Sequence, residues 1–148
     1  MRMIIHLIKR YVWALSAKKP SSSDCVEVGR VLGNELFGLW MTMPIHDQAH
    51  SIVVWRRYLQ LRPSASQSEE AAVLLHDIGK IKSGLGIHAR VCATILGPRT
   101  KRWRMYSEHE AIGAEMLKSL NVDPIIVAIV LGEGHPDIQD ALRKADDI

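Results

Sequence analysis

The stretch AAVLLHDIGK, residues 71–80, constrains the fold more than any other part of the sequence, because an apolar run leads directly into His76 and Asp77. Apolar runs of this kind are typical of buried segments, so the imidazole and the carboxylate are carried toward the interior with it. A buried, ionised carboxylate without partners costs several kcal/mol. We therefore expect charged or metal-binding side chains from other parts of the chain to face this pair.

Hydrophobic periodicity along the rest of the chain predicts an all-α fold. Apolar residues recur at helical spacing, and no run of alternating polar and apolar residues is long enough to indicate a strand. The pairs Asp24 with Glu27 and Ser107 with Glu110 have the spacing of capping boxes, and Asp123 before Pro124 is typical of a helix start. The predicted helices cover residues 47–61, 69–78, 84–97 and 107–120, with others that begin at 24, 123 and 136.

The length and composition favour one compact domain. The chain has 148 residues, of which 47% are hydrophobic, and a chain of this size buries roughly two thirds of its unfolded surface. The net charge of +3 is a mild basic excess that favours anionic partners without implying DNA or RNA. Cys25 and Cys92 lie outside any CxxC spacing, so neither a disulfide framework nor a thiolate zinc site is predicted, and a cytoplasmic location fits best.

The N-terminal segment, residues 1–23, is expected to form a helix and a linker ahead of the main domain, residues 24–148. Lys9 and Arg10 interrupt its apolar run, which is too short for a membrane span, so no stable membrane insertion is expected. We expect its apolar stripe to pack on the domain; the alternative is a helix that lies on a membrane surface with its basic side chains facing headgroups. The stripe consists of Ile4, Ile8, Tyr11 or Val12, and Leu15.

The histidines supply partners for the His76–Asp77 pair. There are seven in the chain, and three of them come from separate predicted elements: His50 before SIVVW, His109 in the first turn of a helix, and His135 in the turn GEGHPD. A single histidine is more often a structural or surface residue than a ligand. Helical bundles, however, build metal sites from side chains on facing helices. The set, with an aspartate on the last helix, therefore predicts a metal site.

The order of His50, then His76–Asp77, then an aspartate in KADD resembles the HD superfamily of metal-dependent phosphohydrolases, and HDIGK is one of the commonest forms of its motif. The resemblance covers residues 46–148 and implies an HD-domain helical bundle. The additional histidines in HEAIGAEML and GHPD resemble the subtype that binds two metals. That subtype includes dinucleoside tetraphosphate hydrolases of the HD type and the HD-GYP cyclic-di-GMP phosphodiesterases.

The resemblance implies two sets of metal ligands, with the Asp77 carboxylate bridging them. The first metal would be held by His50, His76, Asp77 and Asp146, and the second by His109 and His135. Imidazole and carboxylate ligands without cysteine argue against a closed structural zinc site and suit two divalent ions, Fe or Mn in the first place and Zn, Co or Ni as alternatives. Such ions depress the pKa of a bridging water and attract phosphate oxygens.

Two neighbouring residues compete for ligand positions. His46 lies one helical turn before His50; we prefer His50, because a residue in the first turn usually faces solvent. Asp147 competes with Asp146; the family pattern, in which the aspartate follows alanine directly, selects Asp146.

The candidate catalytic residues are Asp77 and Lys80. Lys80 either contacts a substrate phosphate and assists the leaving group, or it is a cation at a helix C-terminus. Arg90 and Arg102, the latter in the basic run PRTKRWRMY, are further candidates for substrate binding. A charge run is more often a solvated loop.

We therefore predict a two-metal phosphohydrolase that acts on a phosphoester or phosphoanhydride of a nucleotide or another small phosphate compound. No GYP triplet follows HDIGK, which separates the chain from the cyclic-di-GMP phosphodiesterases. The alternative is a non-catalytic HD module that binds a nucleotide signal or a protein partner.

Overall fold

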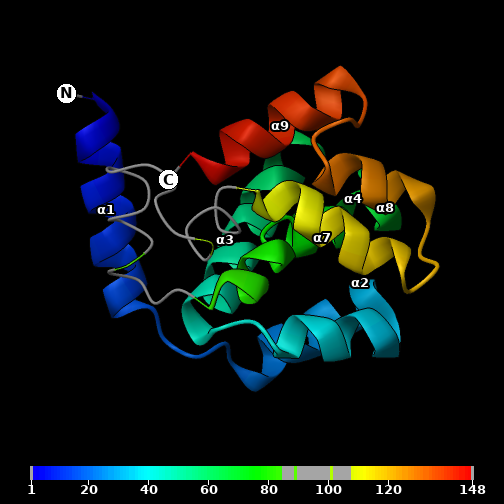
Figure 1. Cartoon of the computed structure of the whole chain (residues 1–148), viewed down its shortest axis with the longest axis horizontal. Helices are drawn as coiled ribbons and strands as arrows, with labels where there is room; N and C mark the ends of the chain where they lie inside the picture. Colours follow the sequence, from blue (N-terminus) through cyan, green and yellow to red (C-terminus); the bar gives the residue numbers. More distant parts are fainter. Residues whose placement is uncertain (1, 85–88, 90–100, 102–107, 148) are drawn as a thin grey trace.

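The computed structural model describes residues 2–84, 89, 101 and 108–147, and within these ranges it consists of helices and their connections, without a strand (Figure 1). The predicted all-α fold is confirmed. The predicted helix over 84–97, together with Arg90 and Arg102, falls almost entirely outside the described residues. The elements are α1 (Arg2–Ser16), α2 (Ser22–Met41), α3 (Ile45–Leu61), α4 (Gln67–Leu75), the 3-10 helix η1 (Ile78–Ser83), α7 (His109–Lys118), α8 (Pro124–Val130) and α9 (Pro136–Asp146).

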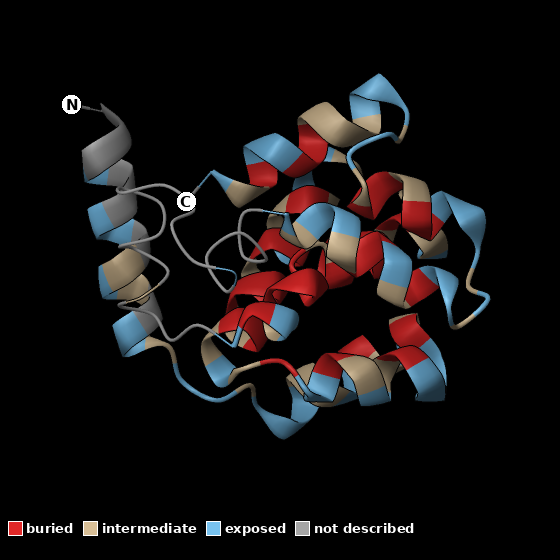
Figure 2. Cartoon of the chain, viewed as in Figure 1, coloured by how far each residue is buried: buried red, intermediate tan, exposed pale blue. Residues whose placement is uncertain are grey.

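Helix α4 lies in the interior of the bundle. It packs against α2, α3 and α8, and its residues 71–75 are each no more than 2% exposed. Figure 2 shows the buried residues gathered along α4 and on the sides of the neighbouring helices that face it. The apolar run AAVLL is therefore part of the core, as predicted. It fixes the end of α4, where the His76–Asp77 pair begins.

The break after α4 comes earlier than predicted. The helix ends at Leu75, with His76 as its C-cap and Asp77 as the N-cap of η1, so the prediction of a helix to residue 78 was wrong. Gly79 lies inside η1 where η1 crosses α7. A Cβ atom at Gly79 would lie 1.8 Å from the backbone oxygen of His109. Only glycine permits this approach, which brings the start of α7 next to Asp77.

Two helix starts differ from the predicted caps. Helix α2 begins with a capping box made by Ser21 and Asp24: the Asp24 amide donates to Ser21 Oγ at 3.1 Å, and the Ser21 amide donates to Asp24 Oδ2 at 2.8 Å. The predicted box of Asp24 with Glu27 was wrong, because Asp24 is already the second member of the earlier box. The N-cap of α7 is Glu108, whose side chain makes no capping hydrogen bond. The predicted Asp123–Pro124 start of α8 is confirmed.

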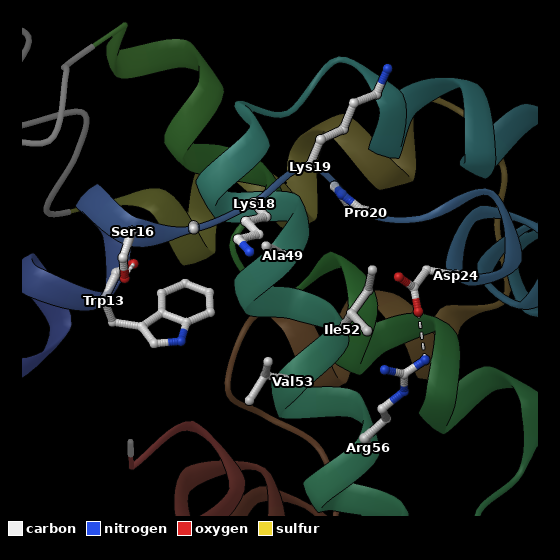
Figure 3. Close-up of a pocket in the computed structure, with 11 residues that line it drawn as sticks. Trp13, Ser16, Lys18, Lys19, Pro20, Asp24, Ala49, Ile52, Val53 and Arg56 are labelled. Atoms are coloured by element: carbon white, nitrogen blue, oxygen red, sulfur yellow. Dashed lines mark hydrogen bonds and ion pairs between the residues drawn. The ribbon is translucent and has the colours of Figure 1, made fainter.

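Helix α1 packs on the domain through a face other than the predicted stripe. Ile8, Val12 and Leu15 are 56%, 57% and 54% exposed, so the prediction that they pack was wrong. The contact with α3 is made by Trp13, whose indole stands edge-on to the imidazole of His50 with ring centroids 5.5 Å apart. Figure 3 shows Trp13 directed from α1 toward α3, where it lines a cavity of about 310 Å³. Successive helical residues point about 100° apart, so Trp13 and Val12 cannot face the same way.

Candidate metal centre

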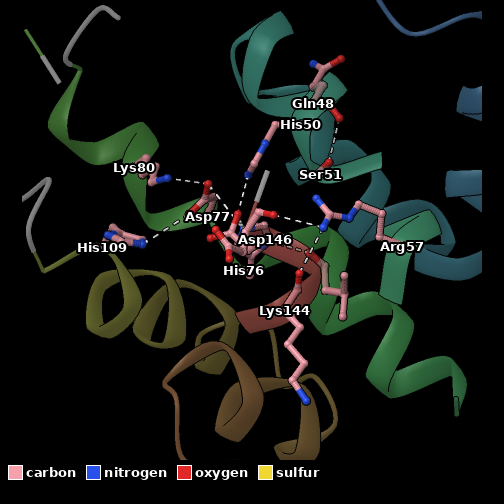
Figure 4. A network of polar contacts seen from close by, with 12 residues as sticks. Gln48, His50, Ser51, Arg57, His76, Asp77, Lys80, His109, Lys144 and Asp146 are labelled. Carbon is pink, nitrogen blue, oxygen red and sulfur yellow. Dashed lines mark hydrogen bonds and ion pairs between the residues drawn. The ribbon is translucent and has the colours of Figure 1, made fainter. Parts of the chain in front are cut away.

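A cluster of imidazoles and carboxylates from four parts of the chain meets at the C-terminal end of α9 (Figure 4). One ligand atom from each of His50, His76 and Asp77 lies within 4.8 Å of the others. Asp146, the last residue of α9, joins them: its Oδ1 lies 2.7 Å from Nε2 of His50 and 3.7 Å from Nε2 of His76. The four residues predicted to hold the first metal are thus brought together by α3, the α4–η1 junction and α9.

His76 presents one ring nitrogen to this cluster without a hydrogen-bond partner. Its Nδ1 lies 2.7 Å from the carbonyl oxygen of Val73, and because a carbonyl only accepts, Nδ1 carries a proton and donates it. Among the described residues, Nε2 of His76 is buried and has no hydrogen-bond partner. A histidine whose Nδ1–H is held by a backbone carbonyl has the tautomer and ring orientation of a metal ligand.

The electrostatics around His76 are dominated by its two carboxylate neighbours. Burial alone would lower the pKa of His76, but the charges of Asp77 and Asp146 outweigh it and raise the pKa to about 9. The site therefore attracts positive charge to the position beside Nε2. A divalent cation there would satisfy the orphaned nitrogen and both carboxylates together.

Asp77 connects two sides of the cluster. Burial would raise its pKa, but Lys80, His76 and His109 hold the pKa well below its usual range. Oδ2 of Asp77 lies 2.5 Å from Nζ of Lys80, and Oδ1 lies 3.3 Å from Nε2 of His109. The carboxylate is ionised and only 3% exposed, so both oxygens depend on these cationic or donor partners. Lys80 is itself only 7% exposed and lies within the cluster rather than at the surface.

The structure does not bring His135 to this cluster. His135 is the N-cap of α9, where its Nδ1 accepts a hydrogen bond of 3.3 Å from the Asp137 amide, and its side chain is 68% exposed. Asp146 stands at the other end of the same helix. A helix of 11 residues is about 16 Å long, which is far more than the roughly 4 Å between the ions of a two-metal site. The described fold thus places His109, but not His135, beside Asp77.

The two competing residues occupy different positions from the ligands that they were compared with. Nε2 of His46 lies 3.3 Å from the carboxylate of its neighbour Asp47, whereas His50 lies in the cluster. Asp147 is the C-cap of α9, and its backbone oxygen accepts the hydrogen bond from α3 described next.

Arg57 positions the end of α9, and the sequence reasoning missed it. Its guanidinium donates to the backbone oxygens of Lys144 at 3.3 Å and Asp147 at 3.1 Å. A cation at the C-terminus of a helix is favourable, and here it also fixes the residues on both sides of Asp146. The available signal was spacing: Arg57 follows His50 by seven residues, or two helical turns, and so lies on the same face of α3.

The comparisons with known proteins agree with this geometry. The family model for the HD domain matches residues 48–145, well over half of the chain. The chain belongs to the HD-domain family. The matched region begins two residues before His50 and ends one residue before Asp146. It covers α3 from residue 48 on, α4, η1, α7, α8 and all of α9 except Asp146. The HD domain implies binding of a divalent metal, and the group of His50, His76 and Asp77 is compatible with it.

No curated protein and no solved structure matched the sequence. None of the described helices has the length and apolar character needed to cross a bilayer.

Proposed function

We propose that this HD-domain protein is a metal-dependent phosphohydrolase that cleaves a phosphoester or phosphoanhydride bond in a nucleotide or another small phosphate compound. The observation that carries the proposal is the orphaned Nε2 of His76, which is buried beside the ligand atoms of His50, Asp77 and Asp146. A buried nitrogen without a hydrogen bond is costly, and its nearest charged neighbours, the carboxylates of Asp77 at 3.6 Å and Asp146 at 3.7 Å, are ligand types of a metal site.

The donor set favours a catalytic ion over a structural one. Two imidazole nitrogens and two carboxylate oxygens suit Fe or Mn first, with Zn, Co or Ni as alternatives. Fe and Mn accept more than four ligands, so positions stay open for water and for substrate. The bound ion supplies two things, a water of lowered pKa and polarisation of a phosphoryl oxygen.

The geometry supports one ion better than two. His109 beside Oδ1 of Asp77 is the only one of the two predicted second-site histidines that approaches the cluster. We therefore propose a site of one ion held by His50, His76, Asp77 and Asp146. A second ion beside His109 requires a further ligand that replaces His135.

Lys80 is proposed to act on the phosphate. Its ammonium lies against the Asp77 carboxylate. Because the Lys80 residue is only 7% exposed, water screens its charge little. An ion bound at Asp77 would share that carboxylate, which leaves the lysine charge to offset the charge of an incoming phosphate group. Arg90 and Arg102 remain proposed substrate contacts.

The proposal is tested with protein loaded in turn with Fe²⁺, Mn²⁺, Co²⁺, Ni²⁺ and Zn²⁺ and assayed against nucleotides, dinucleoside polyphosphates and simple phosphate esters. We expect turnover that depends on the metal. Asp146→Asn should lower kcat/KM by at least about 100-fold, because it removes an ionised ligand, whereas the neighbouring Asp147→Asn should leave it nearly unchanged. Binding of a nucleotide without product under every metal would contradict the proposal and would support a non-catalytic module instead.

A further inference from the structure

The outer face of α1 is apolar and unpaired with the rest of the described chain. Its large aliphatic residues recur every three or four positions, which places them on one side of the helix. They are Ile5, Ile8, Val12 and Leu15, at 50%, 56%, 57% and 54% exposure. Single exposed aliphatic residues are ordinary on protein surfaces, but four on one face of one helix form a continuous stripe.

The positive charge of the chain is concentrated in the segment that carries this stripe. Residues 1–23 contain five of the chain's 19 Lys and Arg residues and none of its 16 Asp and Glu residues. The rest of the chain therefore has more acidic than basic residues, so the net charge of +3 comes entirely from this segment. The described side chains Lys9, Lys18 and Lys19 are exposed.

We propose that α1 binds to an anionic lipid surface, with its axis along the surface and its aliphatic stripe among the headgroups. An apolar stripe flanked by basic residues is the pattern of helices that lie in the membrane interface. At 15 residues α1 is about 22 Å long, which is shorter than the ~30 Å hydrocarbon core, so it lies on the bilayer instead of crossing it. Pairing with a second copy of α1 is disfavoured, because it would bring two strongly basic segments together.

The packing of α1 on the domain is compatible with this orientation. Trp13 contacts His50 from a different face of the helix, so lipid binding to the stripe does not require that contact to break. The candidate metal centre then lies close to the membrane surface, behind α1. The proposal goes beyond the phosphohydrolase function and does not depend on it.

The test is co-sedimentation of the full chain with vesicles of phosphatidylcholine alone and of phosphatidylcholine mixed equally with phosphatidylglycerol. We expect binding to the anionic vesicles, little to the neutral ones, and weakening at high salt. The double variant Ile8→Gln with Val12→Gln should weaken binding at least about tenfold, because it removes apolar area from the interface. The matched variant Val26→Gln with Ile125→Gln removes aliphatic residues of similar exposure, 54% and 51%, from α2 and α8 and should bind as the wild type does.

A second pair of variants tests the charge. Lys9→Gln with Lys18→Gln should weaken binding by about fivefold per lysine. Lys118→Gln with Lys144→Gln makes the same change in net charge on α7 and α9 and should have little effect. The proposal is overturned if the wild type does not bind anionic vesicles or if the matched variants lose binding equally. It is also overturned if light scattering shows that the stripe variants abolish a dimer while vesicles bind nothing, because the stripe would then be a self-association surface.

Discussion

Both ends of α9 were predicted to contribute ligands to one metal centre, but only the C-terminal end lies in the cluster. At its C-terminal end, Asp146 lies 2.7 Å from His50, and Arg57 fixes the backbone on both sides of it. At its N-terminal end, His135 is 68% exposed and caps the helix. The difference teaches that the order of ligand types along a chain identifies candidates, whereas the rigid length of a helix decides which of them can approach one ion. We propose that the C-terminal end, at Asp146, holds the metal and that the N-terminal end, at His135, does not.

The largest effect is expected from the first ligand on α3. His50→Ala should lower metal affinity at least about 100-fold, since even the partners of metal ligands contribute 10- to 100-fold. His46→Ala, one turn earlier on the same helix, should change affinity by no more than about threefold, within the scatter of surface substitutions. Equilibrium dialysis followed by metal analysis measures both. If His46→Ala loses the metal and His50→Ala keeps it, the α3 ligand is His46 and not His50.

The close crossing of η1 and α7 gives the next effect. Gly79→Ala should destabilise the protein by about 3 kcal/mol, at the upper end of overpacking, because the added Cβ meets the His109 backbone oxygen. The control is Gly38→Ala in α2, where the added Cβ meets nothing within 4 Å. It should raise stability by roughly 0.5–1 kcal/mol. Urea unfolding distinguishes them, and equal stability of the two variants would show that α7 does not approach Asp77 as closely as described.

Arg57 tests how firmly the end of α9 must be held. Arg57→Met should weaken metal binding by about tenfold, as loss of an outer partner does, because the backbone around Asp146 loses its donors. Arg56→Met removes the neighbouring arginine, which pairs with Asp24 at 2.6 Å on the other side of α3. That exposed pair contributes about 1 kcal/mol or less and should not affect the metal. Calorimetric metal titration compares the two, and an equal loss from both would remove the special role of Arg57.

The smallest effect is expected at the exposed end of α9. His135→Ala should leave metal content and affinity unchanged within about twofold, and it should cost only about 0.5–1 kcal/mol of stability as a weak N-cap is lost. Metal analysis and thermal unfolding check both parts. Loss of one of two bound ions in this variant would restore the two-metal centre and would mean that α9 or its loop moves when metal binds.

Most of the ligand cluster could be predicted from the sequence, because its signals are either local or carried by distinctive residue types. The run AAVLL predicts a core helix by hydrophobicity alone, and His76–Asp77 follows it directly. The residues His50 and Asp146 are separated by most of the chain, and the resemblance to the HD superfamily selected them as ligands. The structure places both in the cluster.

Other features depend on tertiary packing that no local pattern contains. The stripe on α1 predicts an apolar face, but not whether protein or solvent meets it. The edge-on contact of Trp13 with His50 joins residues on separate helices, and no spacing rule connects them. The position of His135 follows from the direction of α9, whose C-terminal end contacts Arg57 and His50 on α3. The motif HDIGK does not indicate what its glycine contacts, and only the structure shows that Gly79 permits the approach of α7.

The most direct test is anomalous diffraction from crystals of the protein grown with Mn²⁺. We expect a single strong peak in the cluster, at about 2.0–2.3 Å from Nε2 of His50 and His76 and from carboxylate oxygens of Asp77 and Asp146, the usual range for such ligands. A peak beside His135, or no peak within reach of His76, would contradict the account.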